Sequence, residues 1–167
     1  MKVKNNKVLR KLIILIFVIF IISSYTYEKI TIDVPINLPK VTIKYSGKEI
    51  LTSPGEYAWL KSFSKGQPKT GNSYLAGPSY DVGVMVESFS AKSNSDIKVI
   101  FKSAPPEIIL RRWTVGDSVN EVTKKFDSLK KINNITLPEE KGEYIYEVQG
   151  YWSNTNFTST VFRVLIE

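Results

Sequence analysis

The sequence predicts an all-β fold, an antiparallel sandwich of about seven to nine strands behind an N-terminal transmembrane helix. Two observations lead to this fold class. Short stretches of alternating apolar and polar residues recur roughly every ten residues, with Gly, Pro, Asn or Ser between them. An unbroken apolar run, Leu12–Ile22, follows a strongly basic flank near the start of the chain. We therefore expect one small domain behind one membrane segment.

The N-terminal segment has the pattern of an export signal. Residues 1–11 hold five basic residues and no acid, which predicts a cytoplasmic flank with the rest of the chain outside. Residues 23–27 (SSYTY) lack the small-residue pattern of a cleavage site, and the chain has no cysteine that could accept a lipid. We expect residues 12–27 to be a retained single-pass anchor in the cell membrane. The alternative is secretion after signal cleavage.

Composition excludes several kinds of chemistry. The formal net charge is +7, but the five N-terminal positive charges account for most of it, and residues 28–167 carry a net charge of +2. A nearly neutral domain does not predict a nucleic acid partner. The sequence has no Cys and no His, which excludes disulfides, thiolate catalysis, Ser-His catalysis and ordinary zinc sites. We expect no cofactor and no metal.

The first strands follow the membrane segment. Residues 28–40 contain two prolines among alternating apolar residues, which predicts an extended stalk or an edge strand. The extracytoplasmic domain is expected to span residues 41–167. It begins with a hairpin, because strands at 41–45 and 49–51 flank the turn dipeptide Ser46-Gly47.

Residues 54–86 combine turns, strands and the longest loop. Pro54-Gly55 predicts a turn, and a short aromatic strand is expected at 56–60. Residues 61–78 have almost no periodic apolar signal, and loops of this length are often either functional or tolerated insertions. The insertion is the favoured interpretation. A strand is predicted to resume at 80–86.

The middle of the chain contains one ambiguous element. Residues 97–101 alternate with period two, and a second strand is expected at 107–113 after the Pro105-Pro106 break. Residues 118–131 carry apolar side chains at helical spacing, but their Val and Thr content favours a strand equally. Both possibilities stay open. A short strand is expected at 135–137.

The last third carries the clearest strand signals. Alternating residues predict strands at 142–152 and 158–166. Gly142 and Tyr144 have the spacing of a tyrosine corner, in which the Tyr hydroxyl bonds back to the turn that enters the penultimate strand of an immunoglobulin-like sandwich. Tyr146, two residues later, would occupy the inward position that is a cysteine in antibody domains.

These motifs together resemble a known group of proteins. The relevant stretches are Gly55–Trp59, Trp113 after the double proline, Gly142–Tyr146, Trp152 and Val161–Val164. They resemble small exported Gram-positive proteins that carry one immunoglobulin-like domain of uncharacterised function on a signal helix or a lipid. The resemblance covers residues 38–167. It implies the sandwich and a surface location, and it implies no catalytic residues.

Two groups of side chains are candidates for ligand contact. The first consists of aromatic residues around the long loop: Tyr57, Trp59, Phe63, Tyr74 and Tyr80. Core packing is the simpler explanation for Tyr57 and Trp59. The second is the pair Arg111 and Arg112 beside Trp113, followed by Lys124, Lys125, Lys130 and Lys131. Basic residues among aromatics can bind polyanions such as teichoic acids or anionic headgroups, although a charged outer strand face is the favoured interpretation.

Carboxylates give a weaker signal. Glu139, Glu140, Glu143 and Glu147 form a local acidic cluster, but Glu143 and Glu147 alternate with apolar residues of a predicted strand. We therefore expect them to face solvent, which argues against a carboxylate pair for glycoside hydrolysis.

The expected function is binding. The sequence favours a membrane-anchored, extracytoplasmic, non-enzymatic domain that binds a protein or an envelope component through its loops, above all residues 61–78. The alternative is an inhibitory or sensory ectodomain that acts on a partner protein. An envelope hydrolase is the least favoured of the three.

Overall fold

The computed structural model describes residues 12–20, 34–61, 70–127 and 134–167, in two separate units, Met1–Asp33 and Val34–Glu167. In the first unit, residues 12–20 form a helix whose apolar side chains are all exposed. Across the described ranges, no helix has the length and hydropathy needed to cross a membrane. Residues 1–11 and 21–27 of the predicted flank and anchor lie outside the described residues.

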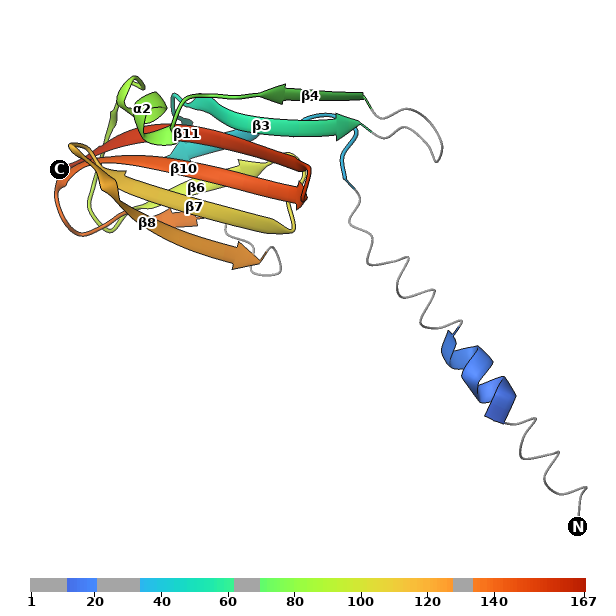
Figure 1. The fold of residues 1–167 in the computed structure, drawn as a ribbon. Coiled ribbons are helices and arrows are strands. Elements are labelled where there is room, and N and C mark those ends of the chain that lie inside the picture. Colours follow the sequence, from blue (N-terminus) through green and yellow to red (C-terminus); the bar gives the residue numbers. More distant parts are fainter. Residues whose placement is uncertain (1–11, 21–33, 62–69, 128–133) are drawn as a thin grey trace, which may run out of the picture. The chain divides into compact units, whose positions relative to one another are not determined.

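The second unit consists mostly of β-strands, which form two antiparallel sheets packed as a sandwich (Figure 1). Within the described ranges, the smaller sheet has four strands in the order β2-β1-β6-β9, and the larger sheet has seven. The strands of the smaller sheet are β1 (Val41–Tyr45), β2 (Lys48–Glu49), β6 (Asp96–Phe101) and β9 (Asn134–Thr136). Those of the larger sheet are β3 (Ser53–Lys61), β4 (Thr70–Tyr74), β5 (Phe89–Ala91), β7 (Glu107–Thr114), β8 (Asp117–Asp127), β10 (Gly142–Ser153) and β11 (Asn156–Ile166).

Strand β11 lies at the centre of the larger sheet, whose order is β4-β3-β11-β10-β7-β8. One edge of β11 pairs with β10 over its whole length. The other edge is shared, because β3 pairs with the first half of β11 and β5 pairs with its last three residues. The β5–β11 pairing is parallel, and the sequence analysis did not predict β5.

The main core lies between the two sheets. Ile43 and Ile97 of the smaller sheet are completely buried and belong to one cluster with Tyr146, Val148 and Phe162 of the larger sheet. Such a core is expected where inward-facing residues of two aligned sheets interdigitate.

Several predicted elements are confirmed. The first hairpin turns at Ser46-Gly47, where both residues have positive φ (48° and 80°), as a two-residue hairpin turn requires. The expected strands at 97–101, 107–113, 142–152 and 158–166 match β6, β7, β10 and β11. The open choice at 118–131 is resolved as a strand for the described part, because β8 runs from Asp117 to Asp127. Residues 128–131 lie outside the described residues.

The predicted turn at Pro54-Gly55 is wrong, because β3 runs through both residues. Pro54 pairs with Thr160 and Tyr57 pairs with Thr158, so an irregularity in register falls between these pairs. A bulge of this kind accommodates proline inside a strand. A Cβ on Gly55 would lie 2.3 Å from Ser159 Oγ, so Gly55 allows β3 to approach β11.

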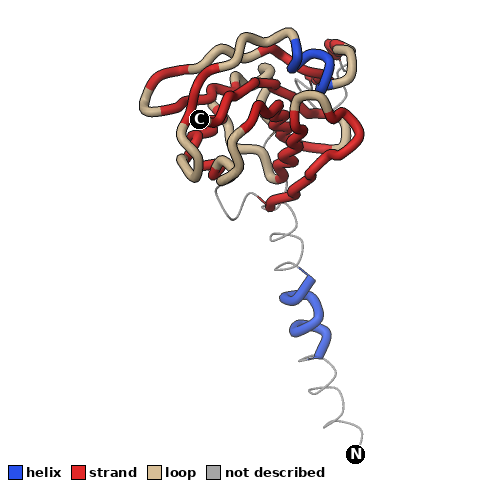
Figure 2. The backbone as a smooth tube through the Cα atoms, turned by 90° about the vertical axis from the view of Figure 1, so that its left-hand side faces the viewer, coloured by secondary structure: helices blue, strands red, loops and turns tan. Residues whose placement is uncertain are grey.

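The predicted strand at 80–86 is also wrong, because this segment contains the short helix α2 (Ser79–Val84), blue in Figure 2. Pro78 occupies the N-cap position, and its carbonyl accepts a hydrogen bond from Val82 N. The helix packs on the outer face of the larger sheet, where Gly83 lies against Ile145. Packing on the sheet therefore outweighs the strand preference that the apolar residues of this segment suggested.

The predicted loop at 61–78 is partly a strand. Residues 70–74 form β4, which pairs with β3 at one edge of the larger sheet, and residues 62–69 lie outside the described residues. Residues 34–40, in the predicted stalk, contain no strand. The Pro35 carbonyl accepts a hydrogen bond of 3.2 Å from Trp59 Nε1, so this part of the stalk packs on the sandwich. Residues 28–33 lie outside the described residues.

Candidate functional site

The entry to β10 has the hydrogen bond that is typical of a tyrosine corner. The Tyr144 hydroxyl donates to the Glu140 carbonyl over 3.1 Å, and the Tyr144 ring is buried. Gly142, which begins the strand, lies beside the same ring. The Arg112 guanidinium lies 5.5 Å from the centre of this ring, at a distance where a cation interacts favourably with an aromatic face.

The candidate aromatic residues do not form one surface. Trp59 is 2% exposed and packs edge-to-face on Trp152, so it is a core residue, as the simpler explanation predicted. Tyr57 stacks on Tyr74 across β3 and β4, with ring centres 5.8 Å apart. Tyr80 lies in helix α2 and not on β3 or β4, and its hydroxyl accepts a hydrogen bond from Gly116 N. Phe63 lies outside the described residues.

The outer face of the larger sheet holds a buried carboxylate, which corrects the prediction that Glu147 faces solvent. Glu147 is 2% exposed, and its Oε2 accepts a hydrogen bond of 2.8 Å from Arg111 Nη1. Its Oε1 accepts hydrogen bonds from the hydroxyls of Ser79 and Ser159 and from Gln149 Nε2. Glu147 does point away from the inter-sheet core, as alternation predicts, but helix α2 covers that face.

The groove around this carboxylate has a volume of about 860 Å³ and also contains Tyr80, Trp113 and Tyr151. Three of its charges are paired, because Arg111 contacts both Glu147 and Glu121. Glu56 and Asp81 also line the groove. Glu147 accepts four hydrogen bonds, and this arrangement joins α2 to the sheet.

The other acids of this region are paired or exposed. Glu143 forms an ion pair with Arg163 over 2.8 Å, and this partner lowers the pKa of the Glu143 carboxyl. Glu139 and Glu140 are exposed in the preceding turn. Within the described ranges, no group of three or more Asp or Glu side chains is placed to hold a metal ion.

Arg112 lies on the opposite face of β7 from Arg111 and points between the two sheets. Ile108 and Leu110 precede it at two-residue steps, and both are buried in the main core. Arg112 pairs with Tyr146 of β10 on one side and with Val122 of β8 on the other. The Arg112 guanidinium therefore lies on the inward face of β7, where the two preceding inward residues are apolar.

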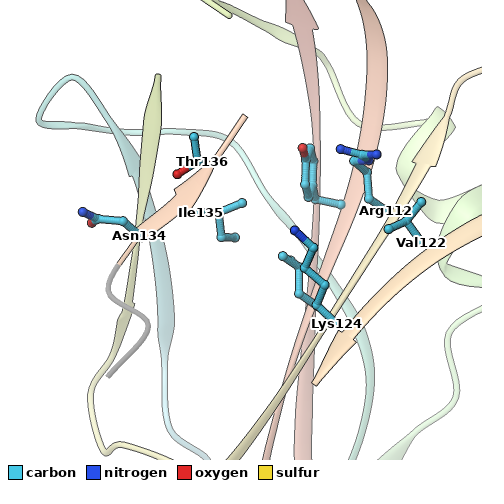
Figure 3. A pocket seen from close by; sticks show the side chains of 8 residues that line it. Arg112, Val122, Lys124, Asn134, Ile135 and Thr136 are labelled. Carbon is cyan, nitrogen blue, oxygen red and sulfur yellow. The ribbon is translucent and has the colours of Figure 1, made fainter. Parts of the chain in front are cut away.

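The inward-facing residues Ile108, Leu110 and Arg112 lead to a pocket of about 230 Å³ between β8 and β9, which are edge strands among the described residues (Figure 3). Arg112, Val122 and Lys124 form one wall, and Ile135 faces them from β9. The remaining lining residues are Leu110, Asn134, Thr136 and Tyr146. The lining includes two cations and no carboxylate among the residues that the structure describes. We call this the inter-sheet pocket.

Tyr146 contributes a buried donor to the inter-sheet pocket. Its ring stacks on Phe162 with centres 5.1 Å apart, and the residue is 2% exposed. Among the described residues, its hydroxyl has no partner with normal hydrogen-bond geometry. Burial raises the pKa of Tyr146 to about 12, although the nearby Arg112 guanidinium acts in the opposite direction. The hydroxyl is therefore protonated at neutral pH and able to donate.

Sequence reasoning named Arg112 and Tyr146 but did not bring them together. The signal was present, because Ile108, Leu110 and Arg112 share one face in the stretch EIILRRW. The partner strand β8 was not assigned, so Lys124 had no expected direction. Lys130, Lys131 and the side chain of Lys125 lie outside the described part of the chain.

No protein-family model matches the chain, and a search of curated proteins finds none that is similar to it.

Proposed function

We propose that this chain is a non-enzymatic binding protein of the immunoglobulin-like class, held outside the cell membrane, which takes its ligand into the inter-sheet pocket. One observation carries the proposal. The pocket contains the buried Tyr146 hydroxyl, whose contact with the Arg112 guanidinium lacks normal hydrogen-bond geometry, and native proteins rarely leave such a group poorly satisfied. A ligand that accepts this hydrogen bond would remove the cost of burying it.

The class and the location rest on separate support. The hydrogen bond from Tyr144 to Glu140 and the two packed sheets favour an immunoglobulin-like sandwich. The basic flank at 1–11 and the apolar run that begins at Leu12 favour a single-pass anchor with an extracytoplasmic domain.

The chemistry of the side chains favours binding over catalysis. The sequence has neither His nor Cys, so the commonest bases and nucleophiles are missing. Of the carboxylates that sequence analysis considered for hydrolysis, Glu143 and Glu147 are each paired with an arginine. An envelope hydrolase is therefore less well supported than a binding protein.

The proposal is tested by site-specific photo-crosslinking in cells that make the full chain. A photoreactive amino acid replaces Val122, which lines the pocket and is 43% exposed. The matched control carries it at Lys48, at the opposite edge of the smaller sheet. We expect an adduct at position 122 that is absent at position 48 and is reduced by Arg112→Gln. Equal adducts at both positions, or none at 122, would exclude the pocket as the binding site.

Partner docking at β4 is a second candidate, in keeping with an inhibitory or sensory ectodomain. All five residues of β4 are exposed, none is charged, and the strand is an edge of the larger sheet. Such edges can pair with a strand of another protein, and charged residues prevent this pairing. Asn72→Lys should therefore abolish capture of a partner that docks here, while Lys48→Ala should not. Unchanged capture by the Asn72→Lys chain would exclude β4 as the docking edge.

A further inference from the structure

The inter-sheet pocket has positive charge that the described residues do not neutralise. Arg112 and Lys124 both line it, and neither forms an ion pair within the described part of the chain. Asp96, on the neighbouring strand β6, accepts a hydrogen bond of 2.8 Å from the Thr136 hydroxyl, and it does not line the pocket. A half-buried guanidinium and an exposed ammonium, neither with a carboxylate partner among the described residues, favour an anion in the space between them.

Three donors of different kinds converge on this space. Arg112 offers a planar fork of N–H groups, Lys124 offers an ammonium, and Tyr146 offers a buried hydroxyl beside the Arg112 guanidinium. A guanidinium, an ammonium and a phenol all donate to oxygen, and the first two favour an anionic oxygen. A carboxylate presents two oxygens to such donors, a free phosphate or a phosphate monoester presents at least three, and a phosphodiester presents two unesterified and two ester oxygens in a tetrahedral arrangement.

The size of the pocket limits the ligand. Its volume of about 230 Å³ is smaller than the roughly 300–1,000 Å³ of sites that enclose a drug-sized molecule. Besides the three donors, the lining consists of the apolar residues Leu110, Val122 and Ile135 and the polar residues Asn134 and Thr136. The pocket therefore fits one compact charged group and not a complete polymer unit.

We infer that the inter-sheet pocket binds a phosphate group through Arg112, Lys124 and the Tyr146 hydroxyl, an inference that rests on the proposed function. The phosphate can be free, part of an anionic polymer, or a lipid headgroup, because all three present anionic oxygens on a tetrahedral phosphorus; the free ion carries more charge than the two diesters. Binding weakens as salt rises, since screening reduces the attraction of the two cations.

The test is isothermal titration calorimetry on the full chain in a neutral maltoside detergent. Inorganic phosphate, glycerol phosphate and a soluble poly(glycerol phosphate) are titrated separately, with acetate as the two-oxygen comparison. Vesicles of phosphatidylglycerol, compared with phosphatidylcholine, form the lipid arm by flotation of the full chain. The arm with the highest affinity identifies the source of the phosphate group.

Three variants test the three donors. Arg112→Gln should weaken phosphate binding by about tenfold or more, because it removes a charge-assisted contact. Tyr146→Phe should weaken it by about fivefold, and Lys124→Ala by about threefold, as for an exposed cation. The matched controls are Lys48→Ala and Tyr57→Phe, which should leave the affinity unchanged. Lys124 is exposed, so its variant tests the inference even if Arg112→Gln fails to fold.

Two outcomes would overturn the inference. One is that no phosphate-bearing probe binds, or that acetate binds as tightly as phosphate. The other is that all three pocket variants bind phosphate like the unchanged chain. Adducts at position 122 without phosphate binding would overturn this inference alone, whereas the loss of those adducts would remove the proposed function.

Discussion

Arg111 and Glu147 face each other across strands β7 and β10, and Arg111 Nη1 donates to Glu147 Oε2 over 2.8 Å. The same carboxylate accepts the Ser79 hydroxyl of α2 and the Ser159 hydroxyl of β11. One buried charge therefore connects a helix to three strands of the larger sheet. This network holds α2 on a face that would otherwise be solvated.

Removal of this carboxylate should destabilise the domain strongly. Glu147→Ala leaves Arg111 partly buried without its main partner, and such a loss costs about 3 kcal/mol. The free energy of unfolding in urea, followed by fluorescence of the three buried tryptophans, measures the effect. Glu49→Ala is the matched control, because it breaks the exposed Lys40–Glu49 pair and should cost less than about 1 kcal/mol. Equal losses in the two variants would contradict a structural role for Glu147.

Helix α2 should be sensitive to a single methyl group. A Cβ at position 83 would lie 2.2 Å from Ile145 Cγ2, so Gly83→Ala forces the helix away from the sheet. We expect a loss of about 1–3 kcal/mol in urea unfolding, as for other overpacked sites. Gly77→Ala is the control, since nothing lies within 4 Å of its Cβ. The penalty of Gly83→Ala should shrink in an Ile145→Ala background, and an unchanged penalty would mean that this contact is not the cause.

The hydrogen bond at the start of β10 should contribute measurably to stability. Tyr144→Phe keeps the buried ring but removes the donor to the Glu140 carbonyl. The expected loss is about 1 kcal/mol, the usual net value of one hydrogen bond. Tyr57→Phe is the control, because no hydrogen bond to the Tyr57 hydroxyl occurs in the described part of the chain. Similar unfolding midpoints for the two variants would exclude a stabilising corner.

Stability at alkaline pH should report on Tyr146. Its pKa is about 12 in the folded protein and about 10 in the unfolded chain, so above pH 10 the unfolded state binds fewer protons. Stability is therefore fully present below pH 10 and is lost as pH rises towards 12, by roughly 2–3 kcal/mol from this group. Tyr146→Phe removes this part of the slope when urea unfolding is measured between pH 8 and 11. It should also raise stability at pH 7, because the unsatisfied hydroxyl is gone. An identical slope in both proteins would contradict the burial of this phenol.

The strands were predictable where apolar residues recur at every second position. In β10, Tyr144, Tyr146 and Val148 recur in this way, and the pattern indicates both the strand and its inward face, although the other face is also buried at Ile145 and Glu147. The hairpin at Ser46-Gly47 was predictable for a local reason, since its backbone conformation depends on two adjacent residues. Both signals lie within a short stretch of sequence.

Other features depend on contacts that a short stretch does not contain. The Pro54-Gly55 dipeptide has turn chemistry, but its conformation is set by pairing with β11, about a hundred residues later in the chain. Glu147 is buried because α2 covers it, and α2 itself was mistaken for a strand. The candidate pocket escaped prediction for the same reason, because it needs the pairing of β7 with β8 and the position of β9.

The central place of β11 has a consequence for the order of events during synthesis. Its neighbours β3, β5 and β10 all precede it in the chain. Strands β3 and β5 share the edge of β11 that is opposite β10. The larger sheet therefore cannot close until residues 156–166 have been made, and earlier segments must wait without a completed core. Strands that pair without β11, such as β7 with β8 and β1 with β6, can form earlier, but completion of the larger sheet is the last step that synthesis allows.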